Sequence, residues 1–235
     1  ETLTMAKVTI IAPGDTKGVN LLKTNSNYDT AHDATAGTNA GNADTKFTIH
    51  GKSGSNYLIR RGILLYDFRA FDDVPAKIRV VKAHLVANDV TENAAQTGGD
   101  KIRVAWLSNP NTFGATHAND YNKTRYATNS YTSAQQLNNG ADGEIIRLDN
   151  RNLLRQLEKA INNRTYLHLV VRNELDYQDT TSTGNNRTFF DRPNADNNPL
   201  KLIITYKSFS RKMHGMRGFG GSHIVSAKGS GFGSF

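Results

Sequence analysis

The segment that most constrains the fold is Arg60–Asn88, which contains two apolar stretches separated by a proline-containing turn. The first stretch, Ile63–Phe68, is almost continuously apolar, which is typical of a strand covered on both faces. The second stretch, Ile78–Ala87, alternates with period two, as a strand with one wet face does. Pro75 and its neighbouring aspartates supply turn residues between the two. This segment predicts a β-rich core.

Several further stretches carry strand signals. Each is rich in β-branched or aromatic residues or alternates in polarity. They are Lys7–Ala12, as an edge or first strand, Asp100–Leu107, Tyr166–Val171 and the closing strand Leu200–Tyr206. The segment Asn25–Asp44 is instead rich in Asn, Ala, Thr, Gly and Asp, and we expect it to form a long surface loop that is too polar to bury.

One short helix is predicted late in the chain, over Asn150–Asn162. Asp149 or Asn150 can cap it, because their side chains accept hydrogen bonds from the first free backbone amides of a helix. Apolar residues then recur at helical spacing, which places them on one face. These residues are Leu153, Leu154, Leu157 and Ile161.

The order of elements is many strands, long polar loops and one helix. Strands without intervening helices cannot make the crossovers of a parallel sheet, so the pattern predicts an all-β protein with an antiparallel β-sandwich. In the predicted organisation, residues 1–207 form the sandwich domain and residues 208–235 form an extended C-terminal arm.

Composition limits the chemistry. The chain of 235 residues has no cysteine, which excludes disulfides, thiolate metal sites and cysteine nucleophiles. Its formal net charge of +8 favours an acidic partner, such as an anionic glycan or an acidic protein surface. Nucleic acid is not favoured, because the charges are scattered and no nucleic-acid motif accompanies them. No apolar run approaches the length of a membrane span.

Five segments of the chain, taken together, form a recognisable pattern that covers about Lys7–Lys207. In chain order they are RRGILLYDF, VPAKIRVVKAHLVA, IIRLDNRNLLRQLEKAINN, YLHLVVRNE and RTFFDRPNADNNPLKLIITY. Together they resemble the DNRLRE domains, which are related to carbohydrate-binding module family 96. The chain departs from that pattern at Tyr66, where Phe is usual, and at Leu148–Asn150, where Val-Asp-Val is common. The resemblance implies a jelly-roll-like β-sandwich used for adhesion, for polysaccharide binding or as a structural module. It implies no catalytic residues.

The histidines do not indicate an enzyme. They lack both the helical spacing of a zinc protease and an adjacent carboxylate pattern. His84 and His168 are expected at outward positions of strands, as solvated or hydrogen-bonded side chains. The expectation is a non-enzymatic protein without a cofactor.

Two aspartate pairs are the alternatives for paired catalytic carboxylates or a structural calcium ion. The first pair is Asp72 and Asp73, and the second is Asp176 and Asp179. Each pair lies in a predicted turn, where aspartate is expected because it hydrogen-bonds its own backbone.

A polar region before the helix contains a candidate sugar-binding platform. Tyr121, Tyr126 and Tyr131 lie there with Lys123 and Arg125 nearby. Exposed aromatic rings beside basic side chains suit an anionic polysaccharide. The alternative is that the same rings cover the edge of the sandwich as half-buried loop anchors.

The C-terminal arm contains the candidate partner-binding residues. It interleaves basic and aromatic side chains with glycines and contains no acidic residue. The residues are Arg211, Lys212, Arg217, Phe219, Lys228, Phe232 and Phe235. So few rings among so many glycines cannot make a core, so the arm is either a flexible solvated tail or a segment held by a partner. We expect it to dock on neighbouring subunits.

Three hypotheses of function follow. The first is a structural protein of a large assembly, in particular a virion, in which a phage capsid decoration or another head or tail component contacts its own copies or a major shell protein. The second is a secreted or cell-surface module that binds an anionic polysaccharide. The third is a filament subunit whose arm adds a strand, with His223–Ala227 as the candidate, to a sheet edge of the next subunit.

Overall fold

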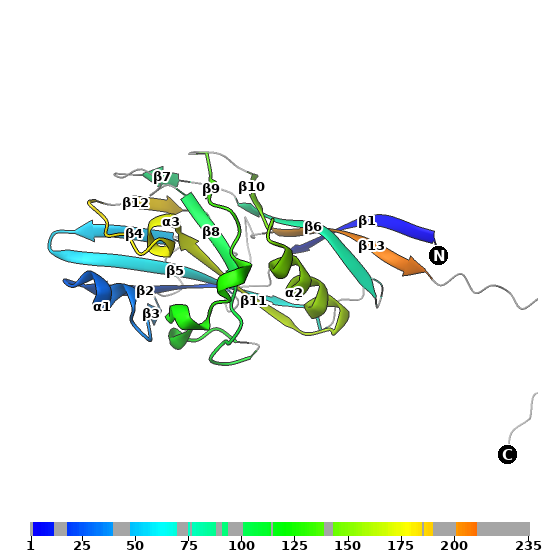
Figure 1. Cartoon of the computed structure of the whole chain (residues 1–235), viewed down its shortest axis with the longest axis horizontal. Helices are drawn as coiled ribbons and strands as arrows, with labels where there is room; N and C mark the ends of the chain where they lie inside the picture. Colours follow the sequence, from blue (N-terminus) through cyan, green and yellow to red (C-terminus); the bar gives the residue numbers. More distant parts are fainter. Residues whose placement is uncertain are drawn as a thin grey trace, which may run out of the picture.

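The structure, a computed structural model, describes residues 2–11, 18–39, 48–69, 75, 77–87, 91–93, 101–113, 115–138, 143–184, 186–189 and 201–210. Within these ranges the chain is mostly β and forms two antiparallel sheets around a shared hydrophobic core (Figure 1). This sandwich-like architecture confirms the prediction of an all-β, antiparallel protein.

The smaller sheet contains four strands in the order β1-β13-β6-β10. Their bounds are β1 (Thr2–Ile11), β13 (Lys201–Ser210), β6 (Ile78–Ala87) and β10 (Glu144–Arg147). β1 lies at an edge, as expected for Lys7–Ala12, and β13 continues past Lys207. β6 alternates buried and more exposed side chains, as its period-two pattern predicts, except at Val81 and Lys82, which are both exposed where the register with β13 shifts.

In the described part of the chain, the larger sheet contains nine strands, seven of which follow the order β7-β12-β4-β5-β11-β8-β9. β2 pairs with both β5 and β3, off this path. The bounds are β2 (Gly18–Asn25), β3 (Thr38–Asn39), β4 (Thr48–Ser53), β5 (Asn56–Asp67), β7 (Thr91–Asn93), β8 (Lys101–Trp106), β9 (Gln135–Gln136), β11 (Tyr166–Asn173) and β12 (Asn186–Phe189).

The central strand β5 is covered on both faces, as its apolar sequence predicts. Its residues from Ile59 to Tyr66 are all buried. Leu64 and Tyr66 belong to the core shared with the smaller sheet, whereas Ile59 and Ile63 belong to a second hydrophobic cluster on the opposite face. That outer face is covered by a layer of short helices and loops, which we call the loop layer.

The loop layer consists of α1 (Tyr28–His32), the three 3-10 turns η1 (Ala118–Tyr121), η2 (Lys123–Arg125) and η3 (Thr128–Ser130), and α3 (Glu174–Tyr177). α1 corrects the prediction that Asn25–Asp44 is a loop too polar to bury. Asn27 caps this helix, and its residues Tyr28, Ala31 and His32 are buried. The prediction of a single helix was therefore incomplete.

The longest described helix, α2 (Arg151–Asn162), confirms the predicted amphipathic segment. The Asn150 side chain caps it by accepting hydrogen bonds from the backbone amides of Asn152 and Leu153 at 2.8 and 3.2 Å. Leu153, Leu157 and Ile161 are buried in the core shared by the two sheets. None of the helices in the described ranges is long and apolar enough to cross a membrane.

Replacement of Asn150 by alanine is expected to lower the free energy of unfolding by about 1 to 2 kcal/mol, because the first turn of α2 loses its cap. The Asn150 amide also donates to the carbonyls of Asn129 and Tyr131, so the loop before α2 loses contacts as well. Urea denaturation measures the change. Arg155→Ala, on the exposed face of the same helix, is the control and should leave stability almost unchanged. Equal stability of Asn150→Ala and wild type would contradict the capping role.

Candidate functional site

Three arginines stand side by side on the outer face of the larger sheet. Arg172 of β11 lies directly opposite Arg103 of β8 in the strand register. Val171 lies opposite Gly62, which places Arg172 next to Arg61 of β5. Like charges on facing strand positions destabilise a sheet, so this row requires acidic partners.

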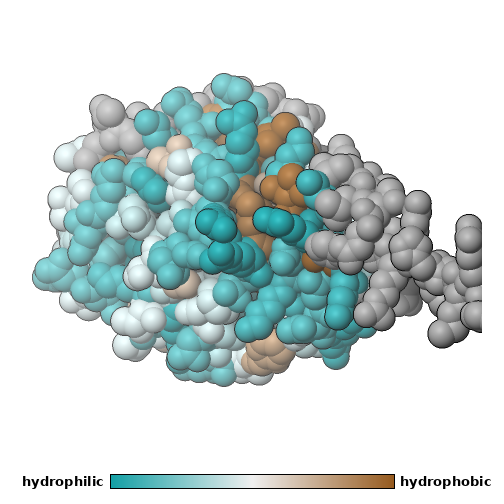
Figure 2. All heavy atoms as spheres, turned by 45° about the vertical axis from the view of Figure 1, so that its right-hand side comes forward, coloured by the Kyte–Doolittle hydropathy of each residue, from teal (hydrophilic) through white to brown (hydrophobic). Residues whose placement is uncertain are grey.

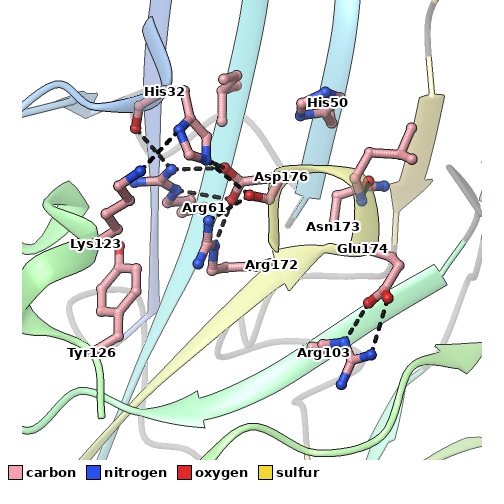
Figure 3. Close-up of polar contacts among 12 residues, drawn as sticks. His32, His50, Arg61, Arg103, Lys123, Tyr126, Arg172, Asn173, Glu174 and Asp176 are labelled. Carbon is pink, nitrogen blue, oxygen red and sulfur yellow. Dashed lines mark hydrogen bonds and ion pairs between the residues drawn. The ribbon is translucent and has the colours of Figure 1, made fainter. Parts of the chain in front are cut away.

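Asp176 is the carboxylate that pairs with both arginines at the centre of the larger sheet. Arg61 donates from Nε and Nη2 to the two Asp176 carboxylate oxygens at 2.9 and 2.7 Å. Arg172 donates from Nε to Oδ2 of the same carboxylate at 2.7 Å. Figure 3 shows the two guanidinium groups converging on this carboxylate. Arg61 and Asp176 are both 0% exposed, so the pair is fully desolvated.

The remaining arginine N–H groups bind the loop layer. Arg61 donates to the backbone carbonyl of Tyr121 at 2.6 Å and to that of His32 at 2.9 Å. Its guanidinium lies 4.3 Å from the centre of the Tyr121 ring, a cation–π contact. Arg172 donates to the Tyr131 hydroxyl at 2.7 Å. One ionic cluster therefore fastens α1, η1 and the segment after η3 to the sheet.

The electrostatics of this cluster are those of a permanent ion pair. Burial alone would raise the pKa of Asp176, but the charges of Arg172 and Arg61 outweigh burial and hold that pKa well below its ordinary value of 3.8. A carboxylate that stays ionised and accepts from two arginines is not a proton donor or acceptor at neutral pH. The arrangement can hold segments together, and it offers no general acid or base.

Arg103, the third arginine of the row, pairs with a different carboxylate. Arg103 forms a bidentate pair with Glu174 of α3, with its Nη2 3.0 Å from Oε1 and its Nε in contact with Oε2 (Figure 3). Its Nη1 donates to the carbonyl of Thr132 at 2.8 Å. The four-residue helix α3 thus supplies both carboxylates, Glu174 and Asp176, that pair with the three arginines of the row.

The ionic network continues toward the surface through His32. The Nδ1 atom of His32 lies 2.7 Å from an Asp33 oxygen and 3.0 Å from an Asp179 oxygen. Its Nε2 atom lies 2.9 Å from the backbone carbonyl of Asp176. Lys123 closes the outer end, with Nζ 2.5 Å from Asp33. These contacts tie η2 and the end of α3 to α1.

The predicted calcium ligands do not form a calcium site in the described residues. Both carboxylate oxygens of Asp176 already accept from arginines, which disfavours a cation there. No group of three or more His, Asp or Glu side chains in the described ranges is placed to hold a metal ion. Asp72 and Asp73 lie outside those ranges.

A separate cleft of about 300 Å³ opens between the C-terminal half of α2, the start of β11 and the segment after β8. We call it the aromatic cleft. Aromatic rings and polar groups line it, which is the composition of small-molecule sites. Its lining includes Trp106, Phe113, Gln156, Lys159, Asn163, Tyr166 and His168.

The loop that carries Phe113 is held by hydrogen bonds to the Asp120 carboxylate and from the Arg125 side chain. Asp120, 0% exposed, accepts from the backbone amides of Asn111 and His117 at 2.7 and 2.9 Å. Arg125 donates to the carbonyl of Asn109 at 2.9 Å. Asp120 immediately precedes Tyr121, whose carbonyl binds Arg61. The ionic cluster therefore supports one wall of the aromatic cleft.

The structure corrects the predicted sugar-binding platform. Tyr121 and Tyr126 are 0% and 4% exposed, so their rings offer no face to a ligand. Tyr131 is half-buried and does not present its ring as a binding surface. Its ring lies against Tyr177, and its hydroxyl accepts a hydrogen bond from Arg172. The physical reason is the arginine row beneath, which the tyrosine rings cover. These residues are loop anchors, and Arg125 positions the loop of Phe113.

Two other predicted groups have different outcomes. His168 and His84 were expected at outward strand positions as solvated or hydrogen-bonded side chains. His168 is not solvated, because it is 2% exposed and its ring lies against that of Phe113, whereas His84 is half-buried. The arm residues Arg211, Lys212, Arg217, Phe219, Lys228, Phe232 and Phe235 lie outside the described residues.

Sequence reasoning missed both the arginine row and the aromatic cleft. A signal for the row existed, because Arg61 and Arg172 each stand inside an apolar strand, and a charge in such a strand requires a buried partner. For the aromatic cleft the sequence signal was weaker. Phe113 and Tyr166 are far apart in the sequence, and each is a single aromatic residue in its own segment.

No protein-family model matches the chain, and no curated protein matches it significantly. The resemblance to the DNRLRE domains therefore stays a prediction.

Replacement of Asp176 by asparagine is expected to lower the free energy of unfolding by about 3 to 5 kcal/mol, because it leaves two buried guanidinium groups without a countercharge. Chemical denaturation measures the loss. Asp67→Asn is the matched control, since Asp67 pairs with Arg69 at the exposed end of β5. The control should lose far less stability. Similar losses in the two variants would contradict the structural role of the buried cluster.

Stability is expected to fall as the pH decreases below about 6.5, the ordinary pKa of histidine. Burial lowers the pKa of His50 and of His168 below the ordinary value of 6.5, so the unfolded chain binds protons more readily than the folded chain. Their contribution is complete above that ordinary pKa and is lost as the pH falls toward the lowered values. Urea denaturation across this range measures the slope. His50→Gln should make the slope shallower; an unchanged slope would contradict the assignment.

Proposed function

We propose that the protein is a non-enzymatic structural component of a large assembly, attached through the outer face of its four-stranded sheet. The assembly that we propose is a virion, with the protein as a phage capsid decoration or another head or tail component. The observation that carries the proposal is an exposed apolar patch on that sheet, framed by basic side chains.

The patch lies on adjacent strands of the smaller sheet. Ile145 of β10 is 51% exposed, and Val81 of β6 is 41% exposed. Ile145 stands opposite Val86 in the register, and Ile203 of β13 stands opposite His84 one row further along the same face. Figure 2 shows hydrophobic side chains gathered on the side of the molecule that carries this sheet. Exposed apolar groups of this kind mark interaction surfaces.

The charges around the patch indicate the chemistry of its partner. Lys82 and Arg147 line a groove of about 400 Å³ with Val81 and Ile145. Lys201 lies beside the patch, opposite Val86. The acid in this groove, Asp149, is engaged by the Ser133 amide at 3.1 Å and by its hydroxyl. A second copy would bring like charges together, so the fitting partner is a different protein with an apolar surface and an acidic rim.

The architecture supports the proposal by analogy. Double-sheet jelly rolls serve as viral capsid and lectin domains. We propose that the two sheets of this protein are a variant of that jelly-roll arrangement. We also propose that the C-terminal arm, residues 208–235, makes a second contact with neighbouring subunits. The arm is basic, as is the rim of the sheet patch.

The double variant Val81→Glu, Ile145→Glu tests the contact surface. Particles purified from the natural source and depleted of the protein are mixed with recombinant chain and sedimented. Wild type should sediment with the particles, and the double variant should bind at least about tenfold more weakly, because two charges enter an apolar contact. Thr128→Glu, Asn129→Glu adds the same charge on the exposed turn η3 and should bind as wild type does. Absence of the protein from particles, or equal binding of the two double variants, would refute the proposal.

A second candidate function is a surface module that binds an anionic polysaccharide, outside the cell or on its surface. The observation that favours it is the aromatic cleft, which has exposed ring surface and a basic rim. The cleft and the sheet patch border different parts of α2, since Leu154 lines the groove beside the patch and Lys159 lines the cleft. Both functions can therefore belong to one molecule.

A further inference from the structure

We propose that the aromatic cleft binds one pyranose unit of an acidic polysaccharide, with the sugar ring on Phe113 and its anionic group at Lys159. This inference rests on the second candidate function and specifies its site. It moves the sugar-binding surface away from the buried loop tyrosines.

The apolar part of the cleft presents a fixed ring to solvent. Phe113 is 63% exposed, although an exposed ring forgoes the stabilisation of burial. Its position is set by Tyr166, 5.4 Å away between ring centres and nearly perpendicular at 82°, and by His168 at 5.9 Å. A flat, accessible ring held at a right angle to a second ring suits the C–H face of a pyranose.

The polar part of the cleft carries groups that are free to bind a ligand. Gln156, Asn163 and Lys159 line it. Within the described part of the chain, the side chains of these three residues make no hydrogen bond or ion pair. An amide presents one acceptor and two donors, which match neighbouring sugar hydroxyls. The cleft thus joins an apolar surface to unused polar groups.

The charge of the cleft favours an anion. Among the described residues that line the cleft, Lys159 is the one basic side chain, and none is Asp or Glu. The nearby Arg69 lies 4.4 Å from the centre of the Tyr166 ring, but its guanidinium is held by Asp67 at 3.0 and 3.1 Å. One unpaired ammonium matches one negative charge, either a carboxylate or a sulfate ester on the sugar.

The size of the cleft limits what it holds. A volume of about 300 Å³ is at the lower end of the range for ligand pockets, so it accommodates one sugar unit and not a long chain segment. Phe113, Lys159 and Asn163 are exposed at its rim, so the rest of a polysaccharide can continue into solvent on either side.

Calorimetric titration of the full chain tests the proposal with three probes: a hexamer of galacturonic acid, a sulfated galactose hexamer and a neutral glucose hexamer. We expect at least one anionic hexamer to bind more tightly than the neutral one. Phe113→Ala should weaken that binding by about threefold to tenfold, because it removes the stacking surface. Lys159→Gln should remove the preference for the anionic hexamer and reduce the dependence of binding on salt.

Two controls separate the site from the function. Lys52→Gln removes the same charge from the exposed end of β4, outside the lining of the cleft, and should bind as wild type does. All variants must keep the melting temperature of wild type. If no hexamer binds to the wild type, both the site and the second candidate function fail. If the wild type binds but Phe113→Ala and Lys159→Gln bind equally well, the function stands and the site is wrong. Equal binding of neutral and anionic hexamers would overturn the role of Lys159.

Discussion

The Asp176 carboxylate lies between the guanidinium groups of Arg61 and Arg172, and the outer half of the molecule depends on this contact. Without it, neighbouring strands would hold buried positive charges, each with a large desolvation cost. A pair of this kind contributes little net stability compared with an apolar core, yet the removal of one partner is severely destabilising. The cluster therefore fixes which segments lie on the sheet more than it stabilises the sheet.

The segments that the Asp176 cluster fixes pack into the second hydrophobic cluster, on the outer face of the larger sheet. Arg61 uses backbone carbonyls of α1 and η1 as acceptors, so those segments have one position on β5. Tyr121 and Tyr126 then cover the guanidinium groups, and the loop that carries Phe113 follows from the position of Asp120. A binding surface needs supporting residues that are themselves locked in place. The proposed sugar site has that support, although Phe113, Lys159 and Asn163 at its rim are exposed.

The sequence predicted the elements whose signal is local. β5 and β6 were recognised from an apolar run and a period-two pattern, and α2 from its cap at Asn150 and its spaced leucines. The loop layer was not recognised, because its composition is polar and its burial depends on partners far along the chain. Arg61 and Asp176 are 115 residues apart, and no local pattern connects them. For the same reason the sequence left open whether the loop tyrosines form a platform or anchor the loops, since nothing in their segment shows that arginines lie beneath them.

Amide hydrogen exchange tests most directly whether the loop layer is part of the folded core. We predict that the amides of residues 118–131 that bond to backbone exchange as slowly as those of β11, with opening free energies near that of global unfolding. In Asp176→Asn, the same amides should exchange first while β6 and β13 stay protected. Exchange of residues 118–131 at the rate of a free loop in wild type, with β5 and β11 protected, would contradict the account.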